Sequence, residues 1–177
     1  MTLVFLKKAF SKKTGSEGTC SMRFSLGTGG AVLRNNRLLM VHHTYEPKVW
    51  RIPGGYVKPE EAAHDACIRE IFEETQIRTK VDGLLGVRHR VNKKDNSTYL
   101  IFQLTPVDFH NPIPDRREID DARYFSLSEI EELSRDQMPE LNRLVARMLL
   151  NGTTPALLSD LGDVNCIDLP YNLYLPS

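Results

Sequence analysis

The sequence predicts a single domain of the α/β (α+β) class, in which a mixed β-sheet lies between α-helices. The chain has 177 residues, of which 41% are hydrophobic, so it is long enough for one ordinary core and too short for a second full domain. Short apolar runs separated by turn residues are typical of strands. Other segments carry the spacing of amphipathic helices.

The first predicted elements form an antiparallel hairpin. Apolar runs at residues 24–33 and 37–43 flank Asn35-Asn36, a pair that tolerates the positive φ angles of a tight turn. The residues before this hairpin, 1–23, are predicted to be a flexible lead-in, because 11–23 are rich in Ser, Lys, Gly and Thr. The folded domain is therefore expected at residues 24–150.

A glycine-rich loop and a helix follow the hairpin. The loop ends in Gly54-Gly55, and adjacent glycines allow a backbone to approach a ligand or metal closely. The helix is predicted over residues 59–75. A loop of this kind that leads into a helix N-terminus indicates a phosphate site.

Three carboxylates share one face of this predicted helix. Glu70, Glu73 and Glu74 stand at i, i+3 and i+4, where like charges repel by a few tenths of a kcal/mol per pair. Arg69 points away from part of this patch and cannot neutralise all three, whereas a divalent cation could. Oxygen ligands alone favour Mg²⁺, Mn²⁺ or Ca²⁺ over zinc.

The remaining elements complete the sheet and cover it. Strands are predicted at residues 80–90 and 98–104 around a polar turn at 92–97, and a last short strand at 122–125. Ser126 and Ser128 each begin a capping-box pattern, so a helix is expected there. A further helix is predicted over 139–150, with a core-facing stripe of Leu141, Leu144, Val145, Met148 and Leu149. The tail, 151–177, is expected to pack on the domain or on a partner subunit of a homodimer.

Residues 55–77 resemble the Nudix box, Gly-x5-Glu-x7-Arg-Glu-U-x-Glu-Glu-x-Gly-U, in which U is a bulky aliphatic residue. The positions that match are Gly55, Glu61, Arg69, Glu70, Ile71, Glu73, Glu74 and Ile77. Gln76 replaces the second glycine, at a position where glycine usually supplies a left-handed helix cap, and its expected cost is about 1 kcal/mol. The alternative interpretation is an acidic surface helix that matches by accident.

The resemblance implies an enzyme with the Nudix fold that hydrolyses the pyrophosphate linkage of a nucleoside diphosphate joined to another moiety. It implies Mg²⁺ as cofactor, with Mn²⁺ as a substitute. The implied substrate is a nucleotide: a nucleotide sugar or ADP-ribose, a nucleoside triphosphate, or a dinucleoside polyphosphate. The alternatives are a non-catalytic nucleotide- or RNA-binding module and an RNA 5′ pyrophosphohydrolase.

The same resemblance implies roles for particular residues. Glu73 and Glu74 are the expected metal ligands, with Glu70 as a further ligand or water activator and the Gly54 carbonyl as a backbone ligand. Arg69 would orient the carboxylates, with Glu61 in support. Glu118 is the candidate for an extra metal ligand or general base, with Asp120 and Asp121 as fallbacks. The candidates for contacts with substrate phosphates are the arginines Arg51, Arg88, Arg90, Arg116 and Arg117.

Composition limits the other function classes. The 23 basic residues balance the 23 acidic ones, so the chain as a whole has no signature of a polyanion-binding protein and RNA is not the favoured partner. Cys20, Cys67 and Cys166 are odd in number and lack CxxC spacing, which argues for a reducing compartment. No apolar run is as long as a membrane span. A soluble, cytoplasmic protein without a membrane partner is expected.

Overall fold

The computed structural model describes residues 23–92, 95–152, 155–159 and 173–175, and the predictions for the lead-in and for most of the tail lie outside them. The elements, in chain order, are β1 (Arg23–Arg34), β2 (Arg37–His43), β3 (Trp50–Arg51), β4 (Gly54–Tyr56), α1 (Ala63–Thr75), β5 (Thr79–Val91), β6 (Asp95–Pro106), β7 (Ile119–Phe125), α2 (Leu127–Glu132), α3 (Glu140–Leu150), β8 (Ala156–Ser159) and β9 (Leu173–Leu175).

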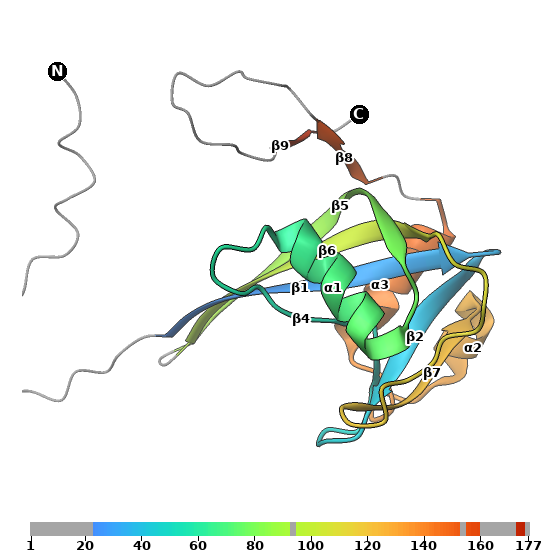
Figure 1. The fold of residues 1–177 in the computed structure, drawn as a ribbon. Coiled ribbons are helices and arrows are strands. Elements are labelled where there is room, and N and C mark those ends of the chain that lie inside the picture. Colours follow the sequence, from blue (N-terminus) through green and yellow to red (C-terminus); the bar gives the residue numbers. More distant parts are fainter. Residues whose placement is uncertain (1–22, 93–94, 153–154, 160–172, 176–177) are drawn as a thin grey trace, which may run out of the picture.

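The strands form a mixed sheet in the order β3-β2-β1-β6-β5-β8-β9, while β4 pairs with β1 and β7 pairs with β2. The β1–β6 pair is parallel and runs from Arg23↔Asp95 to Val32↔Leu104. The other pairings are antiparallel. Figure 1 shows α1 on one side of this sheet and α3 on the other. The predicted arrangement of a mixed sheet between helices is confirmed.

Alternating side chains of the central strands fill two cores. Val32 of β1 and Phe102 of β6 pack with Ile71 of α1. Their chain neighbours Ala31 and Ile101 belong to the other core, together with Val145 and Leu149 of α3. Successive residues of a strand point to opposite faces, so two adjacent positions in each central strand supply both cores.

The hairpin between β1 and β2 is as predicted. Asn35 and Asn36 have φ angles of 52° and 57°, and the flanking register pairs Leu33 with Leu38. Two successive positive φ angles are characteristic of the tight turns whose twist matches that of the strands. Local turn chemistry was therefore sufficient to locate this element.

Three predicted boundaries were wrong. α1 begins at Ala63 rather than at residue 59, because the chain turns before it: Glu60 has φ 66° and the Glu61 N–H donates to the Lys58 carbonyl over 3.3 Å. The predicted turn at 92–97 is shorter, since residues 95–97 extend β6 against β1 and β5. β7 begins at Ile119 and is not the last strand, because β8 pairs with β5 and β9 with β8.

The C-terminal helices confirm the capping signal and correct the apolar stripe. The Ser126 side chain accepts from the Glu129 N–H, and Glu129 accepts from the Ser126 N–H in return. On α3, Leu144 and Met148 are 48% and 42% exposed, so their predicted place in the core was wrong. Arg143 is buried instead, because its guanidinium donates to the carbonyls of Ile130 and Leu133 at the end of α2.

Among the described residues, no helix has both the length and the apolar character needed to cross a membrane.

Trp50 is buried beside Phe125, with their ring centroids 4.8 Å apart, and so anchors the start of the glycine-rich loop in the core.

Gln76 adopts the left-handed conformation that the second glycine of the motif would have. Its φ is 58°, and its N–H donates to the Phe72 carbonyl over 2.9 Å. We expect Gln76→Gly to raise the free energy of unfolding by about 1 kcal/mol, since glycine adopts positive φ without the Cβ penalty. Urea unfolding would measure this. Gln76→Ala keeps the Cβ and serves as the control, so an equal gain from alanine would contradict the explanation.

Candidate active site

Arg69 holds part of the carboxylate face of α1 in place. Its Nε donates to Glu61 over 2.7 Å, and its Nη1 donates to Glu70 over 2.6 Å and to Glu73 over 3.0 Å. The hydrogen bond from Arg69 lowers the pKa of Glu61 to about 2. One guanidinium thus donates to three carboxylates, and Glu74 is not among them.

Glu74 is the buried member of the face, with 6% of its surface exposed. Its Oε2 accepts from the Gly54 N–H over 2.9 Å. Burial, followed by the charges of Glu70, Glu118 and Asp115, raises its pKa to about 8, against the opposing effect of the Gly54 hydrogen bond. A cation placed among these groups would oppose the effects of burial and charge repulsion that raise this pKa.

The loop glycines allow β4 to lie directly against this face. A Cβ on Gly55 would stand 2.5 Å from Cδ of Glu70, which leaves no room for a side chain. The Gly54 N–H faces Glu74 in the same way. The glycine-rich loop thus meets the helix through its backbone and the helix carboxylates, and the Arg69 guanidinium adds a hydrogen bond to the Tyr56 carbonyl over 3.2 Å.

Glu118 lies on a loop that is held from two sides. Asp115 Oδ1 accepts the backbone N–H groups of Arg117, Glu118 and Ile119 over 3.0, 3.1 and 2.9 Å. On the other side, the Thr44 N–H donates to the Glu118 carbonyl over 2.9 Å. Burial opposes ionisation of Asp115, but its three donors outweigh burial and hold its pKa below the ordinary value. The loop brings Glu118 near enough to Glu74 to raise the pKa of Glu74.

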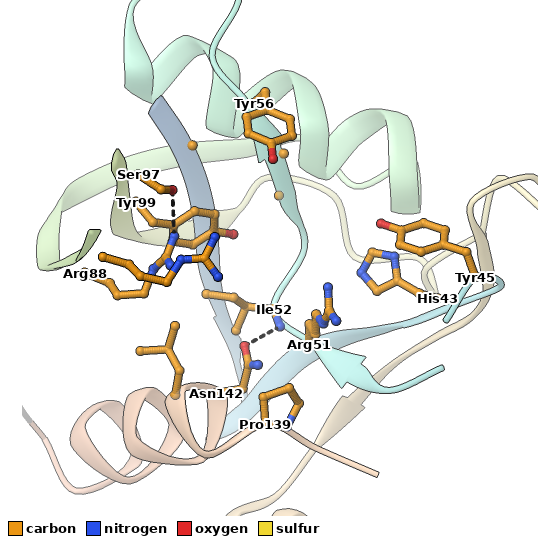
Figure 2. Close-up of a pocket in the computed structure, with 15 residues that line it drawn as sticks. His43, Tyr45, Arg51, Ile52, Tyr56, Arg88, Ser97, Tyr99, Pro139 and Asn142 are labelled. Carbon is orange, nitrogen blue, oxygen red and sulfur yellow. Dashed lines mark hydrogen bonds between the residues drawn. The ribbon is translucent and has the colours of Figure 1, made fainter. Parts of the chain in front are cut away.

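A cavity of about 670 Å³ lies next to the glycine-rich loop (Figure 2). Of the predicted phosphate contacts, Arg51, Arg88 and Arg90 line it. Arg116 does not, since its Nη1 donates to the Asp120 carbonyl over 2.6 Å. The Arg117 side chain is 89% exposed and lies 4.0 Å from Asp115. The structure thus brings together three of the five arginines.

Asp120 and Asp121, the alternatives to Glu118, have other contacts. Asp120 Oδ1 lies 2.6 Å from Nδ1 of His42, and the hydrogen bond with this imidazole lowers the pKa of Asp120. Asp121 lies 3.5 Å from Arg123. Of these three acidic candidates, Glu118 lies on the loop before β7, has no ion pair with another described residue and remains available for a ligand.

Sequence reasoning missed three residues of this region. His43 of β2 lines the cavity, and burial followed by the charge of Arg51 lowers its pKa to about 4. Asn142 reaches the cavity from α3, with Oδ1 accepting from the Ile52 N–H over 3.1 Å. Asp115 had a usable signal, since Asp side chains commonly accept from backbone groups a few residues on.

The donor set fits a hard divalent cation. Glu70, Glu73, Glu74 and Glu118 offer carboxylate oxygens, which suit Mg²⁺ or Mn²⁺. Within the part of the chain that the structure describes, no three acidic, His or Cys side chains are already arranged as a metal site. Arg69 and the Gly54 N–H hold several of these oxygens instead. A cation would therefore have to compete with existing hydrogen bonds for its ligands.

Comparison with known proteins supports the motif. A family model described as "NUDIX domain" matches residues 25–148. Diphosphoinositol polyphosphate phosphohydrolase 3-alpha of Mus musculus is 36% identical over 72 residues, which is 41% of this chain and 43% of that protein. Nucleoside diphosphate-linked moiety X motif 6 of Homo sapiens is 32% identical over 91 residues, or 48% and 29% of the two chains. The chain thus spans less than half the length of these relatives.

Solved structures share the fold. A NUDIX hydrolase from Nitrosomonas europaea has a TM-score of 0.64 at 21% identity and covers 75% of this chain and 93% of its own. A MutT NUDIX hydrolase from Burkholderia pseudomallei has a TM-score of 0.60 at 22% identity, over 71% and 97% of the two chains.

The Asp115 contacts predict that the loop depends on a side-chain acceptor rather than on a charge. We expect Asp115→Ala to leave three N–H donors without their acceptor and to lower the free energy of unfolding by about 1–3 kcal/mol. Asp115→Asn retains an oxygen at the same place and should lose less than half as much. Thermal unfolding of both variants measures this. Equal losses would show that the charge, not the hydrogen bonding, holds the loop.

The raised pKa of Glu74 predicts the pH dependence of the metal-free protein. The folded state binds this proton more tightly than the unfolded state, so its stabilisation is fully present below pH 4.5 and is lost as the pH rises through about 8. In EDTA, the melting temperature should fall between pH 5 and pH 9. Glu74→Gln should reduce that fall, because the amide does not ionise. A wild-type and a variant profile that coincide would contradict the assignment.

Proposed function

The chain belongs to the NUDIX family, whose model matches residues 25–148, and from this we propose that it is a pyrophosphohydrolase that depends on a divalent metal ion. Its substrate would be a nucleoside diphosphate joined to another moiety. The observation that carries the proposal is the convergence of Glu70, Glu74 and Glu118 beside a cavity lined by arginines. Hydrolysis would add one water across the phosphoanhydride and release two phosphate monoesters.

Each residue has a role in this proposal. Glu70, Glu73, Glu74 and the Gly54 carbonyl would hold Mg²⁺, for which Mn²⁺ could substitute. When bound, the ion supplies neutralisation of charge on the pyrophosphate oxygens. Glu118 would accept the proton of the attacking water, since its loop holds it close to Glu74 without an ion pair. Arg69 would keep Glu70 and Glu73 oriented through its two hydrogen bonds.

The arginines of the cavity would bind the substrate. Arg51, Arg88 and Arg90 reach the same space from β3 and β5, next to the loop that contacts the metal face. Guanidinium groups bind phosphate oxygens through paired hydrogen bonds. We favour a small nucleotide over RNA, because the whole chain is electrically balanced and the arginines are confined to a cavity.

The non-catalytic alternative gains no support from Gln76, because the left-handed cap persists without the glycine. The buried Cys67 thiol is consistent with a reducing compartment, and we propose the cytoplasm as the location.

The test is turnover of a substrate panel by the wild type and by Glu74→Gln. The panel contains ADP-ribose, nucleotide sugars, dinucleoside polyphosphates, ordinary and oxidised nucleoside triphosphates and 5′-triphosphorylated RNA, each with Mg²⁺, Mn²⁺ or EDTA. We expect metal-dependent release of a nucleoside monophosphate or of phosphate from one class. Glu74→Gln should lower kcat by about 100-fold or more, because it removes a charged metal ligand.

Glu132→Gln on the exposed face of α2 is the matched control and should leave the rate unchanged. Circular dichroism establishes that both variants are folded. Retention of more than about a tenth of the rate by Glu74→Gln would remove Glu74 from the metal site. Absence of turnover by the folded wild type on every substrate would reject the enzyme and favour a binding module.

A further inference from the structure

Arginines line the cavity beside the glycine-rich loop, and they outnumber the carboxylates that pair with them. Three arginines line it, and no acidic residue is among the lining side chains. Arg90 is compensated from outside the cavity, because its Nη2 lies 2.8 Å from Asp95. The Arg51 side chain has neither a hydrogen bond nor an ion pair with any described residue, although its backbone pairs with Val41 in the sheet. Arg88 has no carboxylate partner among those residues either.

Arg88 is the more constrained of the two uncompensated cations. It is half-buried, its Nη2 donates only to Ser97 Oγ over 3.3 Å, and its Nε is buried with no partner among the described residues. The guanidinium carbon lies 5.3 Å from the ring centroid of Tyr99. Stacking leaves the edge of a guanidinium free to donate. Figure 2 shows Arg88 and Arg51 in the same cavity, reaching it from different strands.

Burial of an unpaired charge is unfavourable unless a ligand supplies the opposite charge. The low pKa of His43, due to burial and then to the charge of Arg51, keeps this imidazole neutral at physiological pH, so it adds no third uncompensated charge. The remaining lining groups near the two arginines, Ser97, Tyr99 and Asn142, offer hydroxyl and amide donors. The side chains that line the cavity therefore favour the binding of an anion.

The cavity and the carboxylate face share one wall. Gly54 lines the cavity, while its N–H donates to Glu74. A Cβ on Gly54 would also stand 2.9 Å from the Tyr99 hydroxyl, and Arg88 stacks on this same ring. A continuous series of contacts therefore leads from Glu74 through Gly54 and Tyr99 to Arg88. A phosphoanhydride held at the carboxylate face would place its linked moiety toward the arginines.

We propose that the moiety linked to the diphosphate carries at least one further phosphate group, and that Arg88 and Arg51 bind it. The inference rests on the proposed pyrophosphohydrolase function and narrows its substrate class. Polyphosphorylated substrates are preferred over nucleoside diphosphates that are linked to an uncharged sugar. Each guanidinium can donate two parallel hydrogen bonds to the oxygens of a phosphate group. A hydrogen bond from the same guanidinium to an uncharged sugar hydroxyl is weaker.

The test compares diadenosine tetraphosphate with ADP-ribose, which share adenosine and a diphosphate. The linked moiety is a second adenosine with two further phosphates in the tetraphosphate and an uncharged ribose in ADP-ribose. The readout is the ratio of their kcat/KM values. We expect the wild type to favour the tetraphosphate by about 10-fold or more, and Arg88→Gln and Arg51→Gln each to lower the ratio by about 10- to 100-fold. Raising the salt concentration should also lower the ratio.

Arg78→Gln is the matched comparison, since it removes an exposed arginine that does not line this cavity. Asp108 already compensates this charge, so the ratio should change by less than about threefold. Circular dichroism and melting temperature verify the fold. Arg51 lies on a different strand from Arg88, so its variant gives a second reading if Arg88→Gln does not fold.

The outcomes separate the two proposals. Metal-dependent turnover with a ratio that neither Arg88→Gln nor Arg51→Gln changes would overturn the inference and leave the pyrophosphohydrolase standing. A wild-type preference for ADP-ribose would do the same. No turnover of either substrate, or of any member of the wider panel, by the folded protein would overturn the enzyme function and the inference with it.

Discussion

The hydrogen bond from the Gly54 N–H to Glu74 joins the two parts of the site on which the rest depends. It ties β4, and through it the central strand β1, to the one buried carboxylate of α1. Gly55 lies against Glu70 with no space for a side chain, so the loop and the helix approach at backbone distance. The contact that fixes α1 on the sheet therefore also fixes the position of its acidic face.

Negative and positive charges lie on opposite sides of this contact between the loop and the helix. On the helix side, Arg69 compensates Glu61, Glu70 and Glu73 and leaves Glu74 to be shaped by burial and by neighbouring acids. On the cavity side, the cations outnumber their partners. A substrate that carries a metal-bound anhydride at one end and a further phosphate at the other would satisfy both halves. Without such a ligand, neither the carboxylate face nor the arginine-lined cavity has all of its charges paired.

Local chemistry was enough to predict most of the elements. Asn35-Asn36 located a turn, the Ser126 capping box located a helix start, and the box spacing located the acidic face. Residues 95–97 were misread because their pairing with β1 is a long-range interaction that their polar composition conceals. The predicted burial of Leu144 was wrong because the carbonyls of Ile130 and Leu133 accept from Arg143, so the face of α3 that carries Arg143 is buried instead. The cavity, with His43 and Asn142, depends on packing between distant elements and had no local signature.

The parallel pairing of β1 with β6 also bears on how the chain reaches this fold. Ten registered pairs join residues 23–32 to residues 95–104, and β2, β4 and α1 all lie in the sequence between them. Contacts across so long a loop carry a large entropic cost before they are rewarded, and they slow folding. During synthesis, β1 must remain without its main neighbour until most of the domain has left the ribosome. The strand against which β4 pairs, β1, is therefore among the first to be made and among the last to be secured.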